Sequence, residues 1–222
     1  MRHSLTHCLL AFVTVSAFAL PSIADEAKVT IVLIGDSYIS SHNVDPNDSF
    51  EVKLEEALNE GMVPVDVLGT GFTSTAFTGA SHLHYLMDNP SVLGTAAMHA
   101  VIVELGQNDC RRYKIAETRA SLDSMLARFA QAHIPVLVVG TAPYDYCEHA
   151  TRPNYNALYV QMFVDLASKY GDLYYRDFKD GVTGHPDLLQ DDHDHPNAQG
   201  EAVIVAKMLP VVQELVARVT KP

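Results

Sequence analysis

The sequence predicts an α/β fold in which a parallel five-stranded sheet is covered by helices on both faces. Apolar strand-like segments alternate with helical segments along most of the chain. The strand-like segments are continuous apolar runs, which is typical of parallel strands buried on both faces. No repeat, low-complexity tract or linker interrupts this alternation, so we expect a single domain.

The predicted strands are short runs rich in Val, Ile and Leu, which favour extended backbone. The first of them ends abruptly at Gly35. Together they comprise residues 29–34, 63–68, 101–105, 136–139 and 173–175. Each is followed by a loop or helix, as the crossovers of a doubly wound sheet require.

The first predicted helix carries Phe50, Leu54 and Leu58 on one face, and Asp48 or Ser49 is expected to cap it. A Gly/Thr/Ser-rich loop is predicted over residues 69–81, followed by a weaker helical stretch that runs through Leu86. Apolar residues at helical spacing predict the remaining three helices. These helices comprise residues 115–132, 155–170 and 198–219.

The N-terminus resembles an export signal. Arg2 and His3 precede an apolar run over residues 9–20, and Ser22 and Ala24 are the small residues that a signal peptidase reads. Cleavage after Ala24 is expected, which leaves residues 25–222 as the mature domain. The alternative is an uncleaved anchor, but the apolar run is shorter than the roughly 20 residues that span a membrane. We therefore expect an exported protein, periplasmic or secreted, without stable membrane insertion.

Charge and cysteine content restrict the partners and the compartment further. The chain has 15 Lys and Arg against 27 Asp and Glu, a formal charge of -12 that argues against nucleic acid as a partner. Cys8 leaves with the signal. Cys110 and Cys147 remain, and in an oxidising compartment they are expected to form a disulfide. Two free buried thiols are the alternative.

Polar and glycine residues gather at the predicted carboxyl ends of the strands, where doubly wound sheets bind their ligands. A further polar cluster, residues 191–196, precedes the last helix. The strand-end residues are Gly35, Asp36 and Ser37 after the first strand, Gly69, Gly71 and Ser74 after the second, and Gly106, Gln107, Asn108 and Asp109 after the third.

These residues suffice for acyl transfer. A serine hydroxyl needs a base, usually an imidazole, and the imidazole needs an acceptor that holds its tautomer. Ser37, His195 and Asp192 could fill these roles, and Asp192 lies three residues before His195. The backbone N–H of Ser37, an N–H of the glycine-rich loop and the Asn108 amide could donate to the oxyanion.

Three blocks in this order resemble the GDSL, or SGNH, hydrolases. They are Gly35-Asp36-Ser37 after the first strand, Gly106-Gln107-Asn108-Asp109 after the third, and Asp192, His195, Pro196 and Asn197 near the end of the chain. Residues 101–109, reading VIVELGQND, are similar to the bacterial periplasmic branch with thioesterase, arylesterase and lysophospholipase activities. The resemblance implies a flavodoxin-like three-layer α/β/α sandwich with no metal or organic cofactor. It also implies Ser37 as nucleophile, His195 as base, Asp192 as its orienting group and Asn108 as an oxyanion donor.

One block departs from the family pattern of asparagine, glycine and oxyanion glycine after the second strand. The register that we favour places Gly69, Gly71 and Ser74 at those positions, so that Ser74 supplies the backbone donor. The competing register makes Gly71 the donor. The absent asparagine at position 69 removes one hydrogen bond that the family would supply near the active-site loop.

Several of these residues also have interpretations that require no catalysis. Ser37 could be a helix cap, and Asp36 is expected to accept hydrogen bonds from loop backbone rather than act as a catalytic acid. Acidic and histidine residues near position 190 could suggest a metal site. Adjacent residues cannot all point inward, however, so we expect His193 and Asp194 to face solvent. The residues of that metal hypothesis are His185, Asp191, His193 and Asp194.

The favoured function is an exported serine esterase acting on a small-molecule carboxylic ester, thioester or lysophospholipid. The alternatives are a carbohydrate O-acetyl esterase of the same fold and a non-catalytic module that binds a small anion. Residues 72–84 and 143–153 are expected to shape the substrate pocket. Phe72, Phe77, Leu83 and Tyr146 favour an acyl chain, and the absence of Trp disfavours a sugar platform. Nothing in the sequence indicates an oligomeric state.

Overall fold

The computed structural model describes residues 28–72, 75–88, 98–110, 115–140 and 154–220. Five strands form one sheet in the order β2-β1-β3-β4-β5, and every neighbouring pair is parallel. The strands are β1 (Val29–Gly35), β2 (Val65–Phe72), β3 (Ala100–Glu104), β4 (Val136–Val139) and β5 (Leu173–Tyr175). This is the flavodoxin-like strand order, which confirms the predicted fold class.

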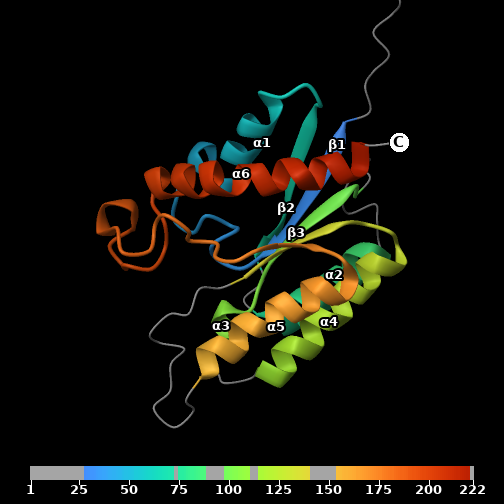
Figure 1. Cartoon of the computed structure of the whole chain (residues 1–222). Helices are drawn as coiled ribbons and strands as arrows, with labels where there is room; N and C mark the ends of the chain where they lie inside the picture. Colours follow the sequence, from blue (N-terminus) through green and yellow to red (C-terminus); the bar gives the residue numbers. More distant parts are fainter. Residues whose placement is uncertain (1–27, 73–74, 89–97, 111–114, 141–153, 221–222) are drawn as a thin grey trace, which may run out of the picture.

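Helices cover both faces of the sheet, giving three layers (Figure 1). On one face, α1 (Phe50–Asn59) and α6 (Ala198–Thr220) pack against the sheet through a buried cluster that includes Leu54 and Met208. The other face carries α2 (Ala76–Asp88), α4 (Ile115–Gln131) and α5 (Tyr155–Tyr170). Leu83, Phe129 and Phe163 belong to the second buried cluster, on that side.

Local polar groups determine where several helices begin and end. The Ser49 hydroxyl oxygen accepts the Val52 N–H at 3.3 Å, as predicted for the cap of α1. At the other end of a helix, Gly171 adopts a left-handed φ of 71° that closes α5. The side-chain oxygen of Asn197 accepts two backbone N–H groups of the first turn of α6, each at 3.0 Å.

The second half of β2 and the start of α2 differ from the prediction. β2 continues to Phe72, so Gly69 and Gly71 lie inside this strand, and α2 begins at Ala76; the predicted loop over residues 69–81 is therefore wrong over much of its length. Pairing with β1 explains the difference, because Gly69 lies opposite Leu33 and Phe72 opposite Gly35. Glycine and threonine have weak or mixed strand preference, and here the neighbouring strand decides.

Short elements escaped prediction because they span less than two helical turns. They are α3 (Gln107–Cys110) and the 3₁₀ turns η1 (Pro46–Asp48) and η4 (Pro186–Leu188). The expected signal peptide, residues 1–24, lies outside the described residues. Across the described part of the chain, no helix is long and apolar enough to cross a membrane.

Candidate active site

The candidate site lies where β1 and β3 end side by side. The strand order changes direction at this point, because β2 lies beyond β1 on one side and β4 and β5 lie beyond β3 on the other. Gly35 closes β1, and a Cβ at this position would collide with the side chain of Ile39. Only glycine therefore permits the tight turn that carries Asp36 and Ser37 out of the sheet. Gly106 opens the matching turn after β3 with a φ of 123°. Such a crevice at the carboxyl ends of the strands is the usual binding place in open α/β sheets.

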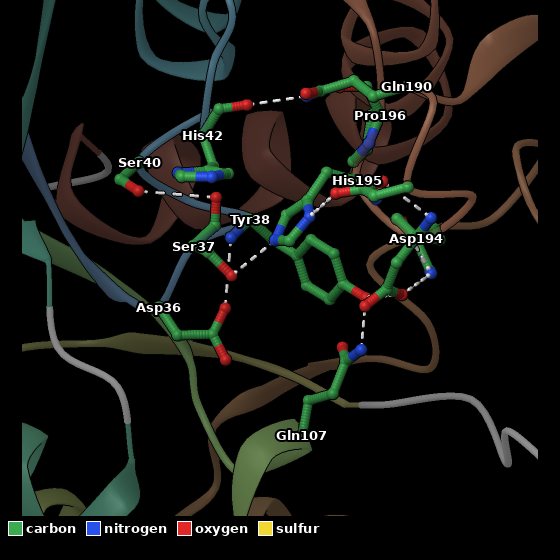
Figure 2. Close-up of polar contacts among 12 residues, drawn as sticks. Asp36, Ser37, Tyr38, Ser40, His42, Gln107, Gln190, Asp194, His195 and Pro196 are labelled. Carbon is green, nitrogen blue, oxygen red and sulfur yellow. Dashed lines mark hydrogen bonds and ion pairs between the residues drawn. The ribbon is translucent and has the colours of Figure 1, made fainter. Parts of the chain in front are cut away.

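Ser37, His195 and Asp192 form a continuous hydrogen-bonded chain. The Ser37 hydroxyl lies 2.8 Å from Nε2 of His195, and Nδ1 of His195 lies 2.6 Å from Oδ2 of Asp192. Figure 2 shows the serine hydroxyl pointing at the imidazole. The structure thus brings together all three residues that the sequence selects for acyl transfer, although 158 positions separate Ser37 from His195.

The turn that carries Asp192 and His195 is fixed by its own hydrogen bonds. Oδ1 of Asp192 accepts the backbone N–H groups of Asp194 and His195, each at 3.0 Å. Burial alone would raise the pKa of Asp192, but these two hydrogen bonds and the His195 ring together lower it to about 2. The Gln190 amide donates to the carbonyl of His42 at 2.6 Å, which ties the turn to the segment after β1 (Figure 2).

Asp36 organises the groups on either side of the serine. Its carboxylate accepts the Tyr38 N–H at 3.1 Å and the Asn108 side-chain amide at 3.0 Å. This matches the structural role that the sequence predicts for Asp36. Asn108 belongs to α3 and lines the same small cavity as Ser37 and His195, a volume of about 40 Å³.

A second acid lies beneath Asp36. Glu104, the last residue of β3, is 1% exposed, and one of its carboxyl oxygens lies 3.5 Å from the Asp36 backbone nitrogen. Burial, followed by the charge of Asp36, raises the pKa of Glu104 well above its usual value. Burial also raises the pKa of Asp36 to about 6. Burial and the neighbouring carboxyl group thus both favour the protonated form of Glu104.

The expected oxyanion donors are placed in part. Asn108 lies at the site, and Gly71, the donor in the competing register, lies in β2 beside the end of β1. Ser74, the favoured donor, lies outside the described residues. A Cβ at Gly69 would meet the carboxylate of Glu51, which is the far end of a flexible side chain and can move away.

The prediction that Asp194 faces solvent is wrong. Its carboxylate accepts the Tyr38 hydroxyl at 2.7 Å and pairs with Nζ of Lys179 at 2.9 Å. Gln107 donates from its side-chain amide to the same Tyr38 hydroxyl. Sequence reasoning missed Tyr38, Gln107 and Lys179 because their partners are distant in the chain. The one available signal was the polar Gln107 inside the strand-end block.

His193 is exposed, as predicted, with a left-handed φ of 57°. His185 and Asp191 are also exposed. Among the described residues, no group of three or more His, Cys, Asp or Glu side chains could hold a metal ion. The metal hypothesis for residues near position 190 therefore finds no cluster to support it in this part of the chain.

Two of the expected substrate-pocket residues can be placed. Phe77, in the first turn of α2, is 69% exposed, whereas Leu83 is fully buried in the core. The segment containing both is helical rather than the predicted pocket loop. Residues 143–153 and Tyr146 lie outside the described residues.

Comparisons with known proteins agree with this geometry. The sequence profile of the GDSL-like Lipase/Acylhydrolase family matches residues 33–203. No curated protein sequence matches the chain at a significant level. The match spans the serine after β1, the block after β3 and the turn before α6.

Solved structures extend the comparison. TesA superposes with a TM-score of 0.73 at 21% identity, covering 84% of this chain and 99% of TesA. The esterase AlinE4, described as an SGNH-hydrolase, gives 0.68 at 27% identity over 87% and 98%. The psychrotrophic esterase EstA from Pseudoalteromonas sp. gives 0.73 at 17% identity over 85% and 98%. The sheet and the helices on its two faces are thus shared with ester-cleaving proteins.

Proposed function

Because the chain belongs to the GDSL-like lipase/acylhydrolase family and is an ester-hydrolysing serine hydrolase, we propose that Ser37, His195 and Asp192 are its catalytic triad. The observation that carries the proposal is the unbroken chain of contacts, 2.8 Å from Ser37 to His195 and 2.6 Å from His195 to Asp192. A binding module has no need of a serine aligned with an imidazole and a carboxylate.

In the first half of the reaction, Nε2 of His195 takes the proton of the Ser37 hydroxyl as its oxygen attacks the ester carbonyl. The ionised Asp192 accepts a hydrogen bond from Nδ1–H and so holds the imidazole in the tautomer that leaves Nε2 free to act as base. A pKa of about 2 keeps this carboxylate charged throughout the working pH range.

The tetrahedral oxyanion needs preorganised donors. We propose the Ser37 N–H, the Asn108 amide and the N–H of Ser74, with Gly71 as the alternative to Ser74. Asp36 supports this arrangement, since it holds the Asn108 amide at 3.0 Å. His195 then protonates the leaving alcohol or thiol, and a water molecule activated by His195 hydrolyses the acyl-enzyme.

We propose a small neutral or zwitterionic ester, thioester or lysophospholipid as substrate. The chain's formal charge of -12 disfavours anionic polymers and surfaces. Phe77, exposed at the start of α2 close behind the proposed oxyanion segment, supports an acyl chain on that side. A carbohydrate acetyl ester is the second candidate; an acetyl-xylooligosaccharide esterase shares the fold at 17% identity.

We also propose that the protein is exported after cleavage behind Ala24, and that residues 25–222 form its single domain. A disulfide between Cys110 and Cys147 fits an oxidising compartment. Cys110 is fully buried at the end of α3 and disulfide-bonded, with its partner outside the described residues. Non-reducing mass mapping of the exported protein tests both the pairing and the cleavage site.

The experiment that tests the function compares the mature protein with Ser37→Ala and with Ser168→Ala, an exposed serine on α5, as the matched control. We expect p-nitrophenyl acetate turnover and fluorophosphonate labelling to be lost in Ser37→Ala and kept in the control. Equal turnover in all three proteins would refute the serine mechanism. A chain-length series of p-nitrophenyl esters beside acetylated xylan then distinguishes acyl esters from acetylated sugars.

A further inference from the structure

The residue directly after the nucleophile is a buried tyrosine. The family's name records Gly-Asp-Ser-Leu, whereas this chain reads Gly35-Asp36-Ser37-Tyr38. The Tyr38 side chain is 1% exposed, so its hydroxyl needs polar partners inside the protein. It donates to Oδ1 of Asp194 at 2.7 Å and accepts the side-chain amide of Gln107, as Figure 2 shows.

Asp194 in turn is paired with a buried cation. Nζ of Lys179 lies 2.9 Å from the Asp194 carboxylate and donates to the Asp194 backbone carbonyl at 3.0 Å. The Lys179 side chain is 5% exposed and that of Asp194 is 26% exposed. A buried ion pair seldom adds net stability, because desolvation offsets the attraction between its charges. Its place beside the active site therefore calls for a different explanation.

The Tyr38 ring connects this pair to the imidazole. Lys179 Nζ lies 5.0 Å from the centre of the Tyr38 ring, and the His195 ring lies 5.4 Å from the same ring. Phe178 stacks against the Tyr38 ring itself, with ring centres 5.6 Å apart and a 12° angle between the ring planes. The segments after β1, β3 and β5 thus all meet the turn that carries Asp192 and His195.

We infer that Tyr38, Asp194 and Lys179 are positioning residues, which hold the turn of His195 in place and keep the net charge behind its imidazole at zero. This inference rests on the proposed function of His195 as the base. The hydroxyl supplies the geometric constraint, and the Lys179–Asp194 pair supplies cancelling charges close to a ring that gains and loses a proton in every catalytic cycle.

Several other charged or titratable groups face His195, and all of them are unchanged in the variants below. Asp192 bonds to its ring from the same turn. His42 lies 5.0 Å away, ring centre to ring centre, and Asp36 interacts with it through its charge; both come from the segment at the end of β1. Lys179, after β5, and Asp194 lie on the remaining side, and they are the two charged groups that the variants change.

Opposite single substitutions should move the pH–rate profile in opposite directions. Lys179→Met adds one net negative charge near the imidazole, favours its protonated form and shifts the acidic limb of kcat/KM to higher pH. Asp194→Asn adds one net positive charge and shifts that limb to lower pH. For a partly buried charge within about 10 Å, each shift should be on the order of 0.5 to 1 pH unit.

Controls separate this effect from damage to the fold. The double variant Lys179→Met/Asp194→Asn restores neutrality, and we expect its acidic limb to return to the wild-type position. Lys169→Met and Asp123→Asn make the same charge changes in an exposed pair 2.6 Å apart and should leave the limb unmoved. Fluorophosphonate titration counts the competent sites, so kcat is normalised even where a variant folds poorly.

Tyr38→Phe tests the geometric part, because it keeps the stacked ring and the charges but removes the hydroxyl. We expect kcat to fall roughly 2- to 10-fold at unchanged KM, with the acidic limb unmoved. The electrostatic role would be overturned if the acidic limb shifted in the same direction in both charge variants, or in neither. An unchanged kcat in Tyr38→Phe would overturn the geometric role. Loss of the proposed function itself is distinct, since the wild type would then hydrolyse esters no faster than Ser37→Ala.

Discussion

Glu201 makes stability depend on pH in a way that can be calculated. It lies in the first turn of α6 and is fully buried, and neither carboxyl oxygen forms a hydrogen bond of standard geometry with the described residues. Burial raises its pKa to about 8, although the Ser41 hydroxyl and the charge of Lys53 lower it in part. We expect Glu201→Gln, which cannot ionise, to stabilise the protein above neutral pH.

The sign follows from proton linkage. The unfolded chain releases the Glu201 proton near pH 4.3, whereas the folded protein holds it until about pH 8. The free energy of unfolding therefore falls as pH rises through this window and levels off beyond it. At about 1.4 kcal/mol per pKa unit, the full window amounts to on the order of 3–5 kcal/mol. Below pH 4 the carboxyl is protonated in both states and the effect vanishes.

The assay is urea unfolding at intervals between about pH 4.5 and 8.5, which are roughly the lower and upper ends of the Glu201 titration. Far-UV circular dichroism suits a chain without Trp. The quantity to plot is the difference in unfolding free energy between Glu201→Gln and wild type, so that the titrations of Asp36 and Glu104 cancel. Glu56→Gln, on the exposed side of α1, should give a flat difference. A flat difference for Glu201→Gln as well would refute the reasoning.

Three further substitutions test the site and its frame. Asn108→Ala should lower kcat by about 10²–10³ with little change in KM, because one oxyanion donor is lost; a loss confined to KM contradicts that role. Gly106→Ala should lower the unfolding free energy by about 1–3 kcal/mol, since the residue has a φ of 123° and a Cβ would lie 3.0 Å from Phe163; an unchanged melting temperature would argue against this strain. Asn197→Ala should cost about 1–2 kcal/mol by removing the cap of α6, and Asn197→Asp, which keeps the acceptor, should recover part of it in thermal unfolding.

Hydrophobic pattern along the sequence predicted those strands and helices that their own residues specify. The apolar run of β4 and the helix α5 agree with the predicted bounds, and Gly171 marks the end of α5 as a glycine in left-handed conformation does. The second half of β2 was not predictable in this way, because only its pairing with β1 makes residues such as Gly69 and Gly71 extended.

Some residues of the candidate site could be predicted from local pattern in the same way, and others could not. Ser37, Asn108, Asp192 and His195 sit in short blocks whose types and order indicate acyl transfer, and the structure brings them together. Tyr38 and Asp194 are 156 positions apart, and no local pattern relates a tyrosine after β1 to a carboxylate before α6. Treating Asp194 as solvent-facing was wrong because the partner that buries it, Lys179, comes from a third segment.

The separation of Ser37 from His195 also has a consequence in time. A ribosome makes Ser37, the proposed nucleophile, early, but Asp192 and the proposed base His195 appear only just before the last helix, and His195 comes 158 residues after Ser37. A growing chain therefore carries a serine without a base for most of its synthesis, and it cannot cleave esters before the turn at residues 191–196 has docked. If the protein is exported unfolded, as the proposed signal peptide implies, catalysis would begin only at the destination.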